Sequence, residues 1–303
     1  MRTKPVTIEQ VGEFGLINRI TRRIKLDASV VVGSGDDCAV LAYNSRYYQL
    51  FTCDMIVEGV DFKRTADWRL VGRKALAVSL SDIAACGGLP RHAVVSLGLP
   101  RSTRVSTVKG ICQGMFALAR EFKVNIVGGD ISRSRQLTID VSMVGLVEKG
   151  KLVLRRGAQV GDFIFVTGPL GDSKRGKHLT FMPRIRMSRY LVSHYRPSAM
   201  IDISDGLAQD LGHILTASRV GAVLYADLIP RAFSSTSLSG ALHDGEDFEL
   251  LFTMPPARAR RLLRNKRTRF FLIGQVTGKQ SGLRLVDRHC RAQAIQTTGY
   301  RHF

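Results

Sequence analysis

The sequence lacks any long hydrophobic run. No uninterrupted apolar stretch in its 303 residues approaches the roughly 20 residues that a membrane-spanning helix needs. Charged and polar side chains interrupt the first residues, MRTKPVTIEQVGEFGLI, so they do not form the apolar core of a signal peptide. The 45% of hydrophobic residues still supply a core for one large domain or two ordinary ones. We therefore expect a globular, cytoplasmic protein with no membrane partner.

Cysteine is scarce. The five cysteines are odd in number, scattered and without a C-x-x-C pair; they are Cys38, Cys53, Cys86, Cys112 and Cys290. This pattern argues against a disulfide framework and against a structural zinc site. It is typical of reduced thiols in a cytoplasmic protein.

Acidic residues are few beside the basic ones. Lysine and arginine number 45 against 25 aspartates and glutamates, which gives a formal net charge of +20. Such an excess occurs in nucleic-acid-binding proteins. The basic residues are spread widely, however, and their densest run, Arg258–Arg269, is interrupted by Leu262 and Leu263. This spacing indicates a solvated surface helix with one buried stripe, so we expect small anions such as nucleotides as ligands and no nucleic acid.

Against these absences stands one organising stretch, AMIDISDGLAQDLGHI at residues 199–214. A short apolar run carries Asp202, a break follows at Ser204–Gly206, and apolar residues then recur at helical spacing. The pattern predicts a strand that delivers Asp202 and Asp205 to a turn before a helix. Carboxylates beside the amides of a helix N-terminus can hold metal ions and the phosphates bound to them. The alternative is that Ser204 or Asp205 only caps the helix.

The same arrangement recurs along the chain. Four acids fall at or near the ends of predicted strands, and a fifth interrupts an apolar helix predicted over residues 71–86; they are Asp37, Asp54, Asp130, Asp202 and, in the helix, Asp82. An aspartate inside such a helix is expensive to bury without a cation or a cap. One acid at a strand end is ordinary turn chemistry, but five in apolar surroundings indicate a shared cation cluster. Several Mg²⁺ ions that serve nucleotide chemistry would be its natural use.

Two further segments bear on domain organisation and on phosphate binding. The stretch EKGK at residues 148–151 marks a composition shift, and we predict a boundary there between domains at 1–148 and 149–303. Residues 171–177, GDSKRGK, follow a predicted strand and fit the start of a P-loop, G-x-x-x-x-G-K. The next residue is His178 instead of the Ser or Thr that binds Mg²⁺, so we interpret this match as coincidental.

Several segments, taken in order, resemble the thiamine-monophosphate kinases, in the superfamily of aminoimidazole ribonucleotide synthetase. They are residues 35–41 (GDDCAVL), 52–62 (TCDMIVEGVDF), 74–90 (KALAVSLSDIAACGGLP), 128–134 (GGDISRS), 166–173 (VTGPLGDS), 201–214, 245–253 (GEDFELLFT) and 299–303 (GYRHF). The resemblance implies a two-domain α/β (α+β) fold of the aminoimidazole ribonucleotide synthetase type. It also implies a homodimer formed through the N-terminal sheets, with ATP near the interface.

The resemblance further implies roles for individual residues. The matching metal ligands, for several Mg²⁺ ions, are Asp37, Asp54, Asp82, Asp130, Asp202 and Asp205, with Thr52 and Cys53 contributing through backbone or side chain. The matching ATP contacts are Gly129, Asp130, Arg155 and Ser204, and Glu246 matches the thiamine end. Asp61 stands where the family usually has a histidine near the substrate, and Thr297 where it often has an aromatic residue. The segment between Ser173 and Asp202 is also shorter than usual.

The implied reaction is ATP-dependent phosphorylation of thiamine phosphate to thiamine diphosphate. The accepting phosphate oxygen is already ionised at pH 7, so no general base and no catalytic His or Lys is needed. Because the departures lie on the acceptor side, a related Mg²⁺- and ATP-dependent kinase or ligase with another anionic acceptor is an alternative. A basic nucleic-acid-binding protein on the same scaffold is another, although it predicts the loss of metal acids that are present here. We expect Asp61 either to pair with the cationic thiazolium or to mark a changed acceptor.

Overall fold

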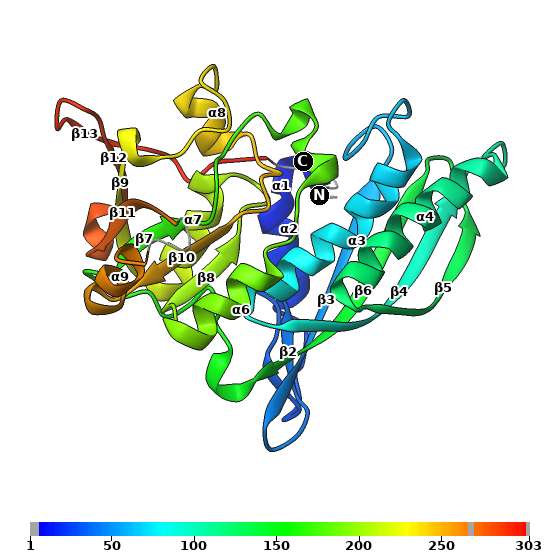
Figure 1. Cartoon of the computed structure of the whole chain (residues 1–303), viewed down its shortest axis with the longest axis horizontal. Coiled ribbons are helices and arrows are strands. Elements are labelled where there is room, and N and C mark those ends of the chain that lie inside the picture. Colours follow the sequence, from blue (N-terminus) through cyan, green and yellow to red (C-terminus); the bar gives the residue numbers. More distant parts are fainter. Residues whose placement is uncertain (1–5, 266–269, 301–303) are drawn as a thin grey trace, which may run out of the picture.

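The computed structural model describes residues 6–265 and 270–300. Over these residues the chain forms two sheets with helices between and around them (Figure 1). The first sheet has six strands in the order β1-β2-β3-β6-β4-β5, and the second has seven in the order β13-β12-β9-β11-β7-β10-β8. This mixed arrangement of helices and two sheets confirms the predicted fold class.

The first half of the chain builds the first sheet. Its strands are β1 (Val30–Val32), β2 (Ala39–Ala42), β3 (Tyr47–Val57), β4 (Leu89–Leu99), β5 (Asn125–Arg133) and β6 (Thr138–Glu148). Its helices are α1 (Ile8–Val11), α2 (Glu13–Thr21), α3 (Trp68–Ala85) and α4 (Val105–Phe122). Strands β4 and β5 are parallel, and the other neighbours in this sheet are antiparallel.

The second half builds the second sheet. Its strands are β7 (Phe163–Val166), β8 (Ala199–Asp202), β9 (Gly221–Tyr225), β10 (Leu250–Met254), β11 (Phe271–Thr277), β12 (Leu283–Val286) and β13 (Ala292–Ala294). Its α-helices are α5 (Lys177–Thr180), α6 (Ile185–His194), α7 (Leu207–Ser218), α8 (Leu238–His243) and α9 (Pro256–Leu263). Short 3₁₀ turns lie at Lys149–Lys151, Ser173–Arg175, Ala226–Leu228 and Lys279–Ser281.

Helix α3 lies at the centre of the molecule, between the two sheets (Figure 1). Most of its residues from Val71 to Ala85 are buried, so the helix is packed on nearly all sides. One hydrophobic core runs from the first sheet through Leu76 and Leu80 of α3 to the near face of the second sheet. There Phe165 of β7 stacks on Phe252 of β10 with ring centroids 5.3 Å apart. Side chains on α3 can therefore reach both halves of the chain.

The second sheet has a separate core on its far face. Residues of β7 alternate between the two cores, so that Phe165 points toward α3 while Ile164 and Val166 point toward α7. This alternation follows from the two-residue period of a strand. Helix α7 packs there through Leu207 and Leu211. Strand β8 and helix α7 thus deliver the organising stretch of the sequence to the boundary between the halves.

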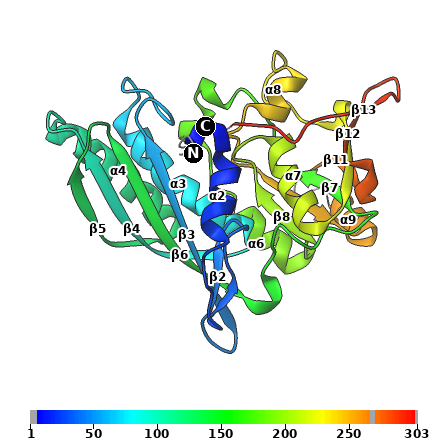
Figure 2. The same ribbon diagram turned by 180° about the vertical axis from the view of Figure 1, so that it is seen from behind.

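The first sheet has one face that no described element covers. Helices α3 and α4 lie on its other face, and the view from behind shows the strands β3 to β6 uncovered (Figure 2). Apolar side chains on this open face are partly exposed, among them Phe51 (44%), Val94 (42%) and Val127 (63%). An apolar sheet face of this kind usually has a partner.

Two strands run further than the sequence predicted. We predicted that strands end at Asp54 and at Val127 before Asp130, but β3 continues to Val57 and β5 to Arg133. Pairing with neighbours extends them, because Asp54 lies opposite Val141 of β6 and Asp130 lies opposite Ser96 of β4. Both acids therefore lie within their strands, three residues before the end.

Two helical segments, one near the start of the chain and one in the basic run, can be compared with the sequence. Helices α1 and α2 at the start of the chain are separated by Gly12, whose φ of 69° lies in the left-handed region. The basic run forms α9, a surface helix that buries Ala259 and Leu262, as predicted. The last part of that run, residues 266–269, lies outside the described residues.

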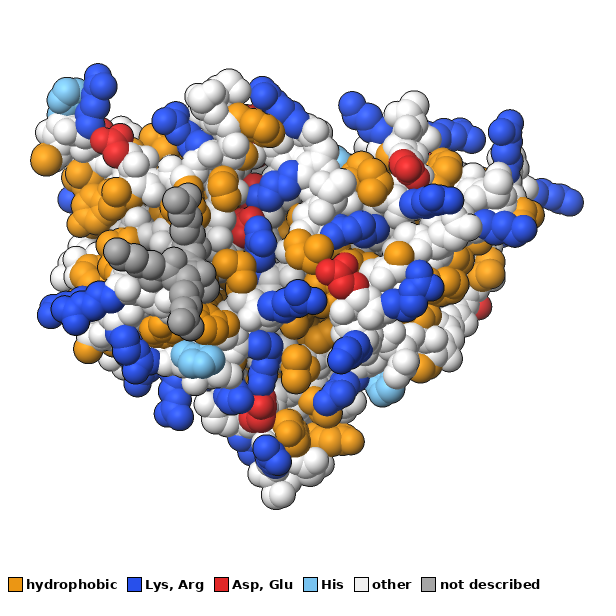
Figure 3. Space-filling model, viewed as in Figure 1, with side chains coloured by type: hydrophobic (Ala, Val, Ile, Leu, Met, Phe, Trp, Pro, Cys, Tyr) orange, Lys and Arg blue, Asp and Glu red, His pale blue; other side chains and the backbone are white. Residues whose placement is uncertain are grey.

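Basic side chains are scattered over the surface. Figure 3 shows Lys and Arg over both halves of one face, interspersed with other side chains and without a continuous stripe. None of the helices within the described ranges is long and apolar enough to cross a membrane.

Candidate active site

Three carboxylates meet between the two halves of the molecule. Asp37 precedes β2, Asp82 lies on α3 and Asp202 ends β8. One oxygen of each lies within 4.8 Å of the others. The structure thus brings together three acids that are up to 165 residues apart in the numbering (202 − 37). We call Asp37, Asp82 and Asp202, with the neighbouring Asp54 on β3, the acid cluster.

Hydroxyl groups fix the carboxylates of the acid cluster. Ser79 on α3 donates to Asp54 at 2.8 Å, and Ser81 donates to Asp202 at 2.6 Å. Thr52 on β3 donates to Asp82. The sequence analysis missed both serines. Their signal is the run VSLSD, in which hydroxyl side chains alternate with apolar ones inside a buried helix.

Burial raises the pKa of each carboxyl in the acid cluster. Burial, followed by repulsion from Asp37, raises the pKa of Asp202 to about 7. Burial also raises the pKa of Asp54 to about 6, despite the hydrogen bond from Ser79. The pKa of Asp82 lies well above its usual value because of burial and of repulsion from Asp54 and Asp202. Close, buried acids of this kind favour either a proton or a cation among them.

Arg155 supplies a positive charge at one side of the acid cluster. Its guanidinium donates to one oxygen of Asp37 from Nη2 at 2.6 Å and from Nε at 3.1 Å. The other oxygen of Asp37, Oδ2, is buried without a hydrogen-bond partner. A buried carboxylate oxygen without a donor is costly, and a metal ion is one partner that satisfies it.

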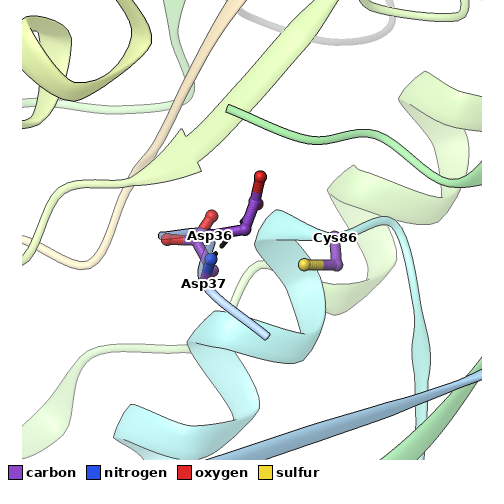
Figure 4. A group of neighbouring side chains, drawn as sticks. All are labelled: Asp36, Asp37 and Cys86. Carbon is purple, nitrogen blue, oxygen red and sulfur yellow. Dashed lines mark hydrogen bonds between the residues drawn. The ribbon is translucent and has the colours of Figure 1, made fainter. Parts of the chain in front are cut away.

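A thiol lies beside the acid cluster. Figure 4 shows Asp36 and Asp37, from the turn before β2, with the sulfur of Cys86 pointing toward them from the end of α3. One ligand atom of each lies within 4.8 Å of the others. The sequence analysis did not select Cys86. Its only signal is its position one helical turn after Asp82.

The turn after β8 does not use Ser204 or Asp205 as a helix cap. The N-cap residue of helix α7 is Gly206, and the helix has no side-chain cap from this position. Instead Asp210, inside the first turn, accepts from the backbone N–H groups of Asp205 at 3.1 Å and Gly206 at 3.0 Å. The capping alternative is therefore wrong. The Asp205 carboxylate accepts from Gln209 at 2.7 Å.

Two predicted metal ligands lie away from the acid cluster. In the register of the first sheet, Asp54 pairs with buried Val141 and faces α3, so its neighbour Cys53 faces the open side. Cys53 there donates to Asp140 at 3.0 Å. Asp130 pairs with Ser96, which in turn pairs with Asp140, so Asp130 shares this open face. Within one chain, Cys53 and Asp130 do not join the acid cluster.

Gly129 lies directly beside β4. A Cβ atom at this position would stand 1.8 Å from the carbonyl oxygen of Val95, whereas the neighbouring Gly128 faces open space. A cavity of about 360 Å³ between β5 and α4 is lined by Gly129, Asp130 and apolar side chains such as Met115 and Phe116. The predicted ATP contacts thus form two groups, with Arg155 and Ser204 near the acid cluster and Gly129 and Asp130 beside this cavity.

A cavity of about 220 Å³ adjoins the acid cluster. Asp54 and Asp205 line it, and the predicted substrate residues Asp61 and Glu246 line it as well. Ser204 also belongs to its wall. We call this cavity the acceptor cavity, because it joins the acids to residues that the sequence assigned to the acceptor.

Thr297 is not part of the acceptor cavity. Its side chain is exposed and lies against Gly212 of α7. Tyr300 lines the cavity instead, together with Phe248, and its backbone N–H donates to the carbonyl oxygen of Asp205 at 2.9 Å. Thr297 thus lies outside the wall of this cavity, because the tail passes over α7 and brings Tyr300, three positions later, to it. The assignment of Thr297 to the substrate stays a prediction.

The lysine of the segment that resembles a P-loop is paired with buried acids. Lys177 lies 3.3 Å from both Asp247 and Glu249, and it donates to the carbonyl oxygen of Pro169 at 2.8 Å. Both acids have side chains that are only 1% exposed. The helix that follows is four residues long. These contacts support the interpretation of the motif as coincidental.

Comparison with known proteins agrees with this geometry. Residues 35–147 match the N-terminal domain of AIR synthase related proteins, and residues 156–286 match the C-terminal domain. The thiamine-monophosphate kinase of Buchnera aphidicola subsp. Schizaphis graminum is 32% identical, with 97% of this chain and 99% of that protein covered. That of Aquifex aeolicus is 36% identical, with 83% and 88% covered. The chain belongs to the thiamine-monophosphate kinase family. The predicted domain boundary at residues 148–149 lies between the two matches and stays a prediction.

The fold is also that of a solved structure from this family. The structure of AaThiL complexed with AMPPCP and TMP has a TM-score of 0.86 and 31% identity, and it covers 99% of this chain and 100% of that one. The likeness thus extends over both halves of the molecule. For the thiamine-monophosphate kinase family, the resemblance found in the sequence is confirmed.

Proposed function

We propose that this protein transfers the terminal phosphoryl group of ATP to thiamine monophosphate and so forms thiamine diphosphate. One observation carries the proposal, which is that a single cavity reaches the acid cluster at Asp54 and is also lined by acidic and aromatic side chains, among them Glu246 and Tyr300. The acids suit a site for phosphates, and the wall suits a cationic heteroaromatic ring. Membership of the thiamine-monophosphate kinase family supports the same reaction.

The residues of the acid cluster fit Mg²⁺. Oxygen donors are the ligands that Mg²⁺ takes, and Asp37 has a buried oxygen that no hydrogen bond satisfies. Asp37, Asp54, Asp82 and Asp202 would hold the metal, with Asp205 in the wall of the acceptor cavity. When bound, Mg²⁺ would neutralise charge on the phosphates. The serines and Thr52 keep the carboxylates in place, and Arg155 orients Asp37.

The chain's own residues contribute to the transfer by positioning. The accepting oxygen of thiamine monophosphate is already ionised, so no side chain has to remove a proton from it. Asp61 and Glu246 place negative charge beside the cationic thiazolium, and Tyr300 and Phe248 offer aromatic faces to the rings. Holding both substrates in line supplies much of the rate acceleration for a reaction of this kind.

For ATP we propose a site at a homodimer interface. Gly129 and Asp130 lie on β5, which two strands, β4 and β6, separate from Asp54 on β3. Neighbouring strands are about 4.8 Å apart, so Gly129 and Asp54 lie about 14 Å apart within one chain. A second copy packed on the open face would cover its exposed apolar side chains and bring further groups to the nucleotide. The apolar cavity beside Gly129 has room for a base.

We also place the protein in the cytoplasm. All five cysteines are free, and three of them are buried or partly buried: Cys38, Cys86 and Cys112. Reduced thiols are the rule in the cytoplasm. ATP and Mg²⁺ are available in the same compartment, which suits the proposed reaction.

The test is a direct turnover assay. Purified protein is incubated with ATP, Mg²⁺ and thiamine monophosphate, and thiamine diphosphate is followed by chromatography. We expect product from the wild type and a loss of at least about 100-fold in Asp82→Asn, because a carboxylate of the cluster is removed. Asp227→Asn, at an exposed position on the second half, serves as the matched control and should retain the wild-type rate. ATP binding without thiamine diphosphate formation would point to a different anionic acceptor.

A further inference from the structure

Lys74 has an unusual place in the acceptor cavity. Among the described residues it is the only lysine or arginine in the buried set, with a side chain 1% exposed, and it lines the cavity from α3. A buried ammonium group is costly unless charged and polar partners surround it. Its position in the wall of a ligand cavity therefore calls for an explanation beyond core packing.

The partners of Lys74 come from two different loops. Its Nζ donates to the carbonyl oxygen of Asp61 at 2.7 Å, in the turn that follows β3. It also forms an ion pair with the carboxylate of Glu246, in the loop between α8 and β10. The first loop belongs to the first half of the chain and the second loop to the second half. Lys74 thus connects the two walls of the acceptor cavity.

The carboxylate of Glu246 lies near two side chains outside its own loop, Lys74 and His178. Glu246 has a φ of 56°, in the left-handed region, and follows Gly245 with a φ of 70°. Its side chain is 20% exposed toward the cavity. The ion pair with Lys74 holds one oxygen, while the other lies 3.6 Å from Nδ1 of His178. Lys74 therefore decides where the negative charge of Glu246 stands.

Lys74 lies at the opposite end of the acceptor cavity from the metal-binding acids. It precedes Asp82 by eight residues on α3, which corresponds to about 12 Å along the helix axis. An acceptor with its phosphate at the acid cluster would place its organic part beside Lys74, Glu246 and Tyr300. The charge that fixes Glu246 then acts on ring binding and not on phosphoryl transfer.

We propose that Lys74 is a positioning residue that sets the acceptor specificity of this site. It holds Glu246 and the Asp61 turn at the separation that a cationic heteroaromatic acceptor requires. This inference rests on the proposed function, since it names what orients the acceptor in the same cavity. Lys74 acts through Glu246 and the Asp61 turn, and takes no part in bond making.

The test compares the Michaelis constants of two variants. Lys74→Met should raise KM for thiamine monophosphate at least about 20-fold, with KM for ATP within about twofold of the wild type and a smaller change in kcat. Lys74→Arg, which keeps the charge, should recover most of the loss in KM. An unchanged KM for thiamine monophosphate in a folded Lys74→Met protein would overturn the proposal.

Arg189→Met is the matched control. Arg189 on α6 also joins the two halves through one carboxylate and one carbonyl oxygen, Glu148 at 2.8 Å and Gly87 at 2.6 Å, but it lies outside the acceptor cavity. The Arg189→Met variant should have a lower melting temperature than the wild type, with both KM values unchanged. A rise in KM for thiamine monophosphate in this variant as large as in Lys74→Met would show a general loss of domain contact and would overturn the proposal.

Two further outcomes complete the experiment. If Lys74→Met does not fold, Glu246→Gln removes the other charge of the pair with little change in shape, and it should raise KM for thiamine monophosphate selectively. An unchanged KM in Glu246→Gln would overturn the proposal. A wild-type protein that binds ATP but does not phosphorylate thiamine monophosphate would overturn the proposed function, and this inference with it. An active wild type with no selective effect overturns the inference alone.

Discussion

Asp61 stands in the acceptor cavity with a structural bond of its own. Its carboxylate accepts from the backbone N–H of Val57 at 2.7 Å and so closes the turn after β3. This bond gives a reason for an acid at a position where the sequence resemblance led us to expect a histidine. The same turn presents the carbonyl oxygen that Lys74 binds.

We predict that Asp61→His lowers turnover of thiamine monophosphate and lowers the free energy of unfolding by about 1 kcal/mol, the usual worth of one hydrogen bond. Asp61→Asn keeps an acceptor oxygen for Val57 and should retain most of the stability. Steady-state kinetics and thermal unfolding of both variants provide the check. Higher turnover in Asp61→His would contradict the prediction and indicate a site that has drifted from a histidine.

The raised pKa values of Asp54 and Asp202 predict a dependence of stability on pH and Mg²⁺. In an unfolded chain an aspartate titrates near 3.9, whereas burial raises the pKa to about 6 for Asp54 and about 7 for Asp202 in the folded protein. The metal-free folded state therefore binds more protons between pH 4 and 7. The contribution of these two carboxyl groups to the free energy of unfolding is therefore greatest below about pH 4, and it is lost as the pH rises through about 7.

Because Mg²⁺ binds the ionised carboxylates, we expect it to raise the melting temperature more at pH 8 than at pH 5.5. Thermal unfolding with EDTA or saturating Mg²⁺ at the two pH values measures the difference. Asp202→Asn, which has no carboxyl to titrate at this position, is the control, and its Mg²⁺-dependent gain in melting temperature should differ much less between the two pH values. Equal gains for the wild type at both pH values would contradict the prediction.

At the scale of single elements, β5 depends on close contact with β4. Gly129 allows the backbone of β5 to approach the Val95 carbonyl oxygen, where a Cβ would stand at 1.8 Å. Backbone cannot move aside as the end of a flexible side chain can. The close contact shapes one wall of the cavity that we assign to the nucleotide base.

We predict that Gly129→Ala lowers the free energy of unfolding by about 2–3 kcal/mol, in the range of a backbone clash, and weakens ATP binding. Gly128→Ala, one residue away and facing open space, should change the free energy of unfolding by less than about 0.5 kcal/mol. Chemical denaturation and ATP titration of the pair make the measurement. Equal tolerance of the two alanines would show that β5 relaxes away from β4 without loss.

At the scale of the whole molecule, the open face of the first sheet carries exposed apolar side chains that no described element covers. Val94 lies on β4, the strand between β6 and β5, and is 42% exposed there. A second copy seated on this face would bury it. Charged side chains are depleted at the centre of such interfaces, because their desolvation is costly.

We predict that Val94→Lys converts a homodimer into a monomer and lowers turnover. Val160→Lys, at an exposed valine (66%) in the loop before β7, is the matched control and should leave the oligomeric state unchanged. Light scattering coupled to size-exclusion chromatography measures the mass of each variant. If the wild type is a monomer, or if the dimer persists in Val94→Lys, the open face is not the dimer interface.

The sequence by itself determined the fold class, the family and the identities of the acids. Period-two and helical patterns predicted most strands and helices, because they depend on local burial. Asp82 in an apolar helix, together with four acids at or near predicted strand ends, was enough to predict a cation cluster, since a buried acid requires a partner wherever the chain places it.

Only the tertiary structure decided which of these residues meet. Strand pairing placed Asp54 toward α3 and Cys53 and Asp130 on the open face, because neighbouring residues of a strand point to opposite sides. The path of the tail put Tyr300, and not Thr297, in the acceptor cavity. The partners of Lys74 lie 13 and 172 residues away in the chain, and contacts at such separations leave no periodic signal in a sequence.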